Sequence, residues 1–157
     1  MSMRQKRIME DAEGHAICGF HKKMRSGSAT AYITVEDQSG ATLVIATIKQ
    51  QREGLSFSGA DIYLHDPPMH IDNDVITSGL PVAIHIEGSV IRKEYDFMMG
   101  NMNDNPFKIA RVVRKLKFFN DQNRNDSYFI EIGPNVDIAF MSICTYAIDE
   151  IFSDNKN

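Results

Sequence analysis

Residues 134–152, Pro-Asn-Val-Asp-Ile-Ala-Phe-Met-Ser-Ile-Cys-Thr-Tyr-Ala-Ile-Asp-Glu-Ile-Phe, decide the fold of this chain. Residues 134–137 are types that start helices, and residues 138–148 then carry no charge. A helix over 137–152 would be apolar around nearly its whole circumference, so we expect it to be buried on all sides. It is shorter than the roughly 20 residues that cross a bilayer. The expected members of the buried helix are Ile138, Phe140, Met141, Ile143, Cys144, Ala147 and Ile148.

A buried strand is the alternative for the same residues. Ile138, Ile143, Thr145 and Ile148 are β-branched, and periodicity does not separate a short buried helix from a buried strand. We favour the helix, and the strand stays open at this point.

The rest of the chain is a series of short β-type runs separated by turn residues. Residues 32–36 and 42–48 flank the turn 37–40 and predict a hairpin. Gly59 interrupts the run 55–64 and indicates a bulge, and residues 66–79, which contain Pro67 and Pro68, are expected to form a long polar loop. Further strands are expected at 16–20, 82–86, 90–98, 107–113 and 128–132.

An apolar helix at the end of a β chain fits best inside a barrel. The helix would be about 24 Å long, close to the height of a small barrel. We therefore predict a mainly β, antiparallel barrel around a central hydrophobic C-terminal helix.

Length and charge limit the function classes. The 157 residues suit a single domain, which we place at residues 8–153 between a disordered start, 1–7, and a tail, 154–157. A net charge of -4, from 17 basic and 21 acidic residues, argues against nucleic-acid binding. Cys18 and Cys144 have neither a disulfide nor a zinc spacing, and residues 1–13 contain no secretory signal. We expect a reducing, cytoplasmic location, with the membrane periphery or the nucleus as alternatives.

Several segments resemble the LURP-one-related family of the tubby C-terminal-like group. They are Tyr-Phe-Ile-Glu-Ile-Gly-Pro-Asn-Val-Asp at 128–137, Ala-Ile-Asp-Glu-Ile at 147–151, Ile-Ala-Arg-Val-Val-Arg-Lys at 109–115, and Glu-Asp-Ala-Glu-Gly at 10–14 followed by Lys22-Lys23. The resemblance implies a tubby-like barrel around a central helix, no enzymatic activity, and a binding or scaffold role with an unknown protein partner. It also implies a link to plant defence.

Fewer residues precede the segment 10–14 than in members of that family. The expected barrel is therefore incomplete. The chain could be a short member, a fragment, or a chain that closes its open barrel edge by forming a homo-oligomer.

One basic cluster could bind an anionic lipid headgroup, because related tubby domains bind phosphoinositides. On a regular strand Arg111 would share a face with Lys115, and Lys108 with Arg114, so a bulge would be needed to gather them. The alternative is an ordinary solvated strand edge. The cluster comprises Lys108, Arg111, Arg114, Lys115 and Lys117.

Other candidate chemistry is weak. Residues 121–132 fail the calcium-loop pattern, because the sixth position is Asp126 and the twelfth is Ile132. The five histidines show no helical ligand spacing, and no nucleophile elbow, phosphate loop or dinucleotide motif is present. We therefore predict no catalytic residues, no metal site and no cofactor.

Overall fold

The computed structural model describes residues 6–25, 28–53, 56–71, 77–100, 103, 105–114 and 128–153. In these residues a single antiparallel sheet runs in chain order from β1 to β9, and one helix, α1, follows it. The strands are β1 (Lys6–Glu10), β2 (Ala16–Arg25), β3 (Ser28–Glu36), β4 (Thr42–Glu53), β5 (Ser56–His70), β6 (Ile84–Ser89), β7 (Glu94–Met99), β8 (Phe107–Arg114) and β9 (Tyr128–Ile132), and the helix is α1 (Ile138–Ser153).

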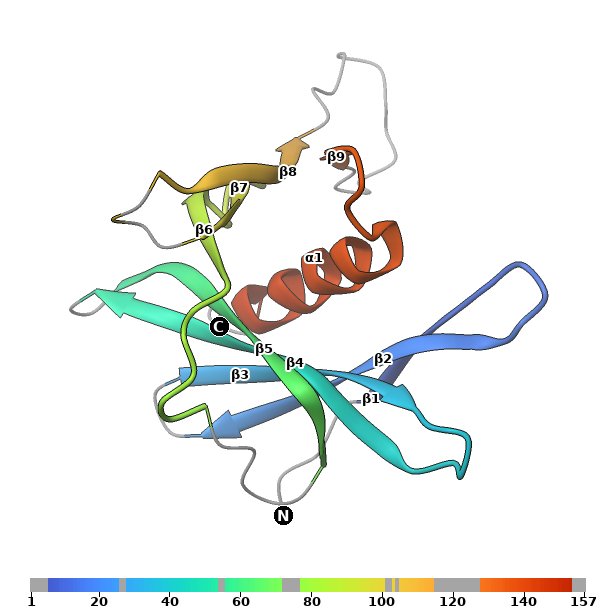
Figure 1. Cartoon of the computed structure of the whole chain (residues 1–157). Helices are drawn as coiled ribbons and strands as arrows, with labels where there is room; N and C mark the ends of the chain where they lie inside the picture. Colours follow the sequence, from blue (N-terminus) through green and yellow to red (C-terminus); the bar gives the residue numbers. More distant parts are fainter. Residues whose placement is uncertain are drawn as a thin grey trace.

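The sheet curls around the helix without closing (Figure 1). Strands β1–β5 cover one side of α1, and β6–β9 lie on the opposite side. The two parts join through a short pairing of Asp61 with His85 and Ile62 with Ile84. Among the described strands, β1 pairs only with β2, and β9 pairs only with β8. The prediction of a mainly β, incomplete barrel around a C-terminal helix is confirmed.

Alternation along the strands builds the core. Every second residue of a strand faces inward, and the inward side chains of five strands pack with the helix in one core. The largest of them are fully buried: Phe20, Ile33, Ile48, Ile62 and Phe97. The predicted hairpin is β3–β4, and its turn is organised by the Asp37 carboxylate. Asp37 Oδ1 accepts hydrogen bonds from the amides of Ser39 and Ala41, at 2.8 and 2.9 Å.

The bulge predicted at Gly59 is present. Gln51 pairs with Gly59 but Arg52 pairs with Phe57, so β5 holds one extra residue at this point. A Cβ on Gly59 would lie 3.0 Å from the Ile86 carbonyl oxygen, which explains why glycine suits the position.

Two expected boundaries are wrong. Strand β5 continues to His70, so residues 66–70 of the expected loop 66–79 belong to a strand. Pro67 and Pro68 lie where the pairing of β5 with β4 is interrupted, so their missing amide hydrogens cost no sheet hydrogen bond. Strand β1 begins at Lys6, so Lys6 and Arg7 belong to the sheet and not to a disordered start. Residues 72–76 and 154–157 lie outside the described residues.

The helix forms as predicted, and Asp137 caps its start. The Asp137 Oδ1 atom accepts a hydrogen bond from the Phe140 amide at 2.9 Å. One face of α1 is buried, comprising Met141, Ile143, Cys144, Thr145, Ala147, Ile148, Ile151 and Phe152.

The prediction that the helix is buried on all sides, however, is wrong. Ile138 is 69% exposed, and Phe140 is only half-buried. Ser142, Tyr146 and Asp149 form a half-buried stripe next to Ile138 at helical spacing. The reason is that the open sheet does not surround the helix completely.

Candidate functional site

An open apolar groove lies beside the N-terminal end of α1. Its volume is about 680 Å³, within the range of roughly 300–1,000 Å³ of small-molecule sites. Ile84, Ile109 and Met141 are buried at its floor, whereas Leu64 and Phe107 are 40% and 58% exposed at its rim. The lining comes from five strands, the β9–α1 turn and the helix: Ile45, Leu64, His65, Asp66, Ile84, Met99, Phe107, Ile109, Pro134, Asn135, Val136, Asp137, Phe140 and Met141.

The groove exists because the two parts of the sheet diverge. Strands β5 and β6 pair only at Asp61 and Ile62, so Leu64 and its neighbours on β5 are not covered by β6. On the other side, β8 brings Phe107 and Ile109 to the same opening. The helix start closes the end between them, with Phe140 and Met141.

Two polar side chains of the groove have structural partners. His65 Nε2 lies 2.8 Å from Thr47 Oγ1, and burial lowers the pKa of His65, so its imidazole is neutral at neutral pH. Asp137 caps the helix. Asp66 is exposed at the rim. These groups can orient a ligand, and the apolar lining would supply its affinity.

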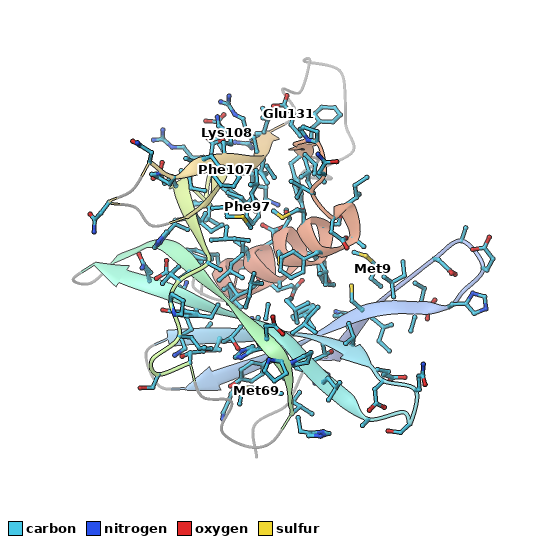
Figure 2. The ribbon with its side chains drawn as sticks, in the orientation of Figure 1. Met9, Met69, Phe97, Phe107, Lys108 and Glu131 are labelled. Atoms are coloured by element: carbon cyan, nitrogen blue, oxygen red, sulfur yellow. The ribbon has the colours of Figure 1, made fainter. Side chains whose placement is uncertain are left out.

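Two members of the basic cluster, Lys108 and Arg111, are paired with an acid. Lys108 Nζ lies 2.9 Å from Asp96 Oδ2, and Arg111 Nε lies 3.7 Å from Asp96 Oδ1. In Figure 2, Lys108 lies on the side of β8 away from the helix, whereas Phe97 lies between β7 and the helix.

A bulge gathers these two cations. Met98 pairs with Lys108 and Phe97 with Ala110, so Ile109 is an extra residue on β8. The extra residue turns Lys108 to the face of Arg111, so the bulge that the sequence required to bring these two charges together is present. Arg114 is exposed at the end of the strand, and Lys115 and Lys117 lie outside the described residues.

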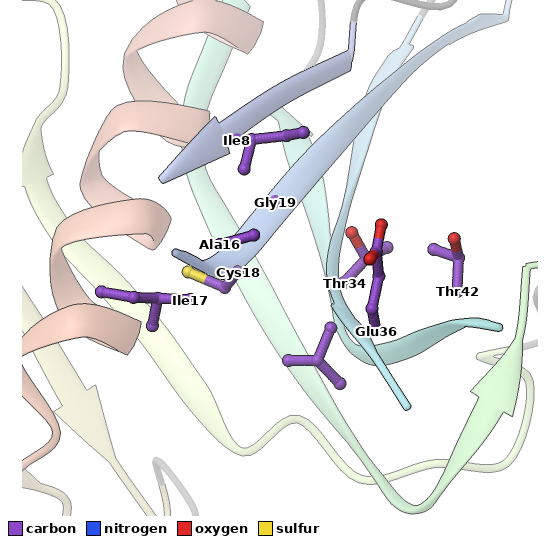
Figure 3. A pocket seen from close by; sticks show the side chains of 9 residues that line it. Ile8, Ala16, Ile17, Cys18, Gly19, Thr34, Glu36 and Thr42 are labelled. Atoms are coloured by element: carbon purple, nitrogen blue, oxygen red, sulfur yellow. The ribbon is translucent and has the colours of Figure 1, made fainter. Parts of the chain in front are cut away.

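A second, smaller pocket is lined by residues of β1, β2, β3 and the start of β4 (Figure 3). Its cavity volume is about 60 Å³, enough for a few waters and too small for a ligand of ordinary size. Ile8, Ile17, Thr34 and Glu36 are among its lining residues.

Possible metal ligands meet in the β1–β2 turn. One ligand atom from each of Asp11, Glu13 and His15 falls within 4.8 Å of the others. The Asp11 carboxylate accepts hydrogen bonds from the amides of Glu13 and His15, at 3.0 and 2.8 Å, so the turn itself accounts for the arrangement.

The two cysteines and His85, the other candidates for chemistry, lie in places where they support the fold. Burial raises the pKa of the Cys144 thiol, and Cys18 is buried as well, which makes both poor nucleophiles. His85 Nδ1 lies 2.8 Å from Asp61 Oδ1, where it links β6 to β5. The predicted loop 121–126 lies outside the described residues.

Sequence reasoning did not find the groove. Its residues are spread between positions 45 and 141, and the one local motif among them, residues 134–137, indicated a helix start and not a groove. The exposure of Leu64 and Phe107 is the feature that reveals it, and exposure depends on the tertiary fold.

One comparison with known proteins, the match to a family model, agrees with the fold. Among the described residues, no helix has both the length and the apolar character of a membrane span. The chain matches no curated protein and no solved structure. The model of one family, described as LURP-one-related, matches residues 1–149. With a match of that extent, and with an open antiparallel barrel around a C-terminal helix, the chain belongs to the LURP-one-related family.

Proposed function

We propose that this protein is a non-enzymatic binding module that holds an apolar group of its partner in the groove beside the start of α1. The observation that carries the proposal is the combination of a buried apolar floor with an exposed apolar rim. Exposed Leu64 and Phe107 cost free energy in water, and a ligand that covers them recovers about 25 cal/mol for each Å² of apolar surface buried.

The polar groups of the groove support binding more than catalysis. His65 is held by Thr47, and Asp137 is held by the first turn of α1. A general base needs its reactive atom directed at substrate, but the His65 Nε2 atom is directed at a threonine hydroxyl. Membership of the LURP-one-related family also supports a binding role.

Nile red, an uncharged apolar dye whose fluorescence rises in apolar surroundings, tests the proposal. We expect saturable binding to the folded protein with one dye per chain. Leu64→Asp places a charge on the rim of the groove and should weaken dye binding by at least about tenfold.

Ile91→Asp is the matched control. Ile91 is 65% exposed and lies in the β6–β7 turn, outside the groove lining, so this variant should bind the dye as the natural protein does. Equal loss in both variants, or non-saturable binding by the folded protein, would refute the groove as the binding site.

A peripheral role at acidic membranes is the second candidate. It is supported by Lys108 and Arg111, which lie together on one exposed face, but Asp96 already neutralises part of their charge. Charge reversal at Arg111 and Arg114 should abolish binding to phosphoinositide-containing liposomes if this role is correct, and binding indifferent to charge reversal contradicts it. The link to plant defence stays a prediction from the family resemblance.

A further inference from the structure

The charged side chains that line the groove all have the same sign. Asp66 and Asp137 are carboxylates, and the lining residues that the structure describes include no lysine or arginine. His65 adds no positive charge, because burial lowers its pKa and keeps it neutral at neutral pH. The nearest basic side chain along β8, Lys108, points to Asp96 on another face. The groove is therefore apolar and acidic.

We propose that the natural occupant of the groove is an apolar ligand with a cationic group, such as an alkyl or aryl amine. This inference rests on the proposed function and adds the chemical class of the ligand. An apolar body would fill the space above Ile109 and Met141, and its ammonium group would lie at the rim near Asp66 and Asp137. An anionic ligand, such as a fatty acid, would bring its carboxylate to the same two acids.

The N-terminus of α1 does not reverse the preference of the groove for a cationic ligand over an anionic one. The N-terminus of a helix carries a partial positive charge that favours anions. In α1, the Asp137 carboxylate already occupies that position, where it accepts a hydrogen bond from the Phe140 amide at 2.9 Å. An incoming anion would compete with this carboxylate, whereas a cation would be attracted to it.

Three ligands with the same eight-carbon chain test the proposal. Octylammonium, 1-octanol and octanoate differ only in the charge of the head group, and each is titrated as a competitor of Nile red. Because Asp66 and Asp137 are solvent-exposed, the electrostatic term is modest. We expect octylammonium to bind about 3- to 10-fold more tightly than octanoate at low salt, with 1-octanol between them, and the ratio to fall as salt rises.

The Asp66→Asn, Asp137→Asn double variant removes both charges and keeps the shape of the groove. Asparagine caps helices as well as aspartate does, so the start of α1 is retained. In this variant the ratio of octylammonium to octanoate affinity should fall to about 1, while 1-octanol binds unchanged. A thermal melt of the variant checks that it is folded.

The outcomes separate the two proposals. If neither Nile red nor 1-octanol binds, the binding function itself is wrong, and the ligand class is wrong with it. If 1-octanol binds and octanoate binds as well as octylammonium, the groove is a binding site but the cationic class is wrong. A preference for octylammonium that survives in the double variant also contradicts the assignment to Asp66 and Asp137.

Discussion

Lys22 and Asp137 stabilise the two ends of α1 from very different places in the chain. Asp137 directly precedes the helix, whereas Lys22 lies on β2, 128 positions before Glu150. The Lys22 ammonium donates a hydrogen bond to the Glu150 carbonyl at 2.7 Å. The last turn of the helix has no basic residue of its own. Its carbonyl groups carry a partial negative charge, and Lys22 of β2 supplies a cation that stabilises them.

Lys22→Met tests this contact, because methionine keeps an apolar stem in the same space and removes the ammonium group. The part-buried Glu150 carbonyl keeps its hydrogen bond from the Ser153 hydroxyl, so loss of the Lys22 donor should lower the free energy of unfolding by about 1 kcal/mol. Urea denaturation measures the change. Lys23→Met, at the next position and on the opposite face of β2, is the control and should cost less; equal losses would contradict the role of Lys22.

The exposure of the basic side chains on β8 was predictable from the sequence, but their pairing with an acid was not. The cations Lys108, Arg111 and Arg114 are exposed, as charged side chains generally are. The pairing of Lys108 and Arg111 with Asp96 could not be predicted, because it depends on the β7–β8 register and on the extra residue Ile109. A register shift of this kind has no local signal in the sequence.

At the scale of the element, the helix was the most predictable part. The uncharged run after Asp137 favoured a helix over a buried strand and indicated where it starts, and the structure has a helix at Ile138–Ser153. Its exposed residue Ile138 was not predicted, because burial was inferred from composition alone. Composition shows which residues can be buried, and the open sheet determines which of them are.

Aspartate substitutions along α1 test its burial pattern. Ile143 is 2% exposed, so Ile143→Asp should cost about 3–5 kcal/mol of a total stability of about 5–15 kcal/mol and leave little folded protein. Phe140→Asp, in the half-buried groove wall, should cost less, and Ile138→Asp should change stability by less than about 0.5 kcal/mol.

Thermal melts followed by circular dichroism give this ranking. Ile138 and Phe140 lie in the first turn of α1, where the helix dipole favours aspartate by about 0.3–1 kcal/mol, which is less than the loss expected at Ile143. A cooperative melt of Ile143→Asp near that of the natural protein would show that α1 is not part of the core.

The strands were predictable as a series, but their ends were not. The hairpin β3–β4 and the bulge beside Gly59 have local causes, namely the Asp37 turn and a backbone approach that excludes a side chain. The end of β5 has a non-local cause. Pro67 and Pro68 indicated a loop, yet the strand passes through them because the pairing with β4 is interrupted there.

At the scale of the whole molecule, the open sheet creates the groove. Strands β5 and β6 separate after a two-residue pairing, and the space between them is lined by residues from both parts of the sheet and from α1. Sequence patterns predicted the sheet and the helix but not where they would leave a gap. The gap is a property of the assembled fold, which is why the groove was not among the predicted sites.

A methyl NMR titration with 1-octanol tests the groove most directly, because isoleucine, leucine and methionine methyl groups lie both inside and outside it. We predict saturable shifts at Ile45, Leu64, Ile109 and Met141 and none at the exposed control Ile91, which lines neither pocket. Equal shifts at the control methyl groups, or no saturation at the groove methyl groups, would contradict the account.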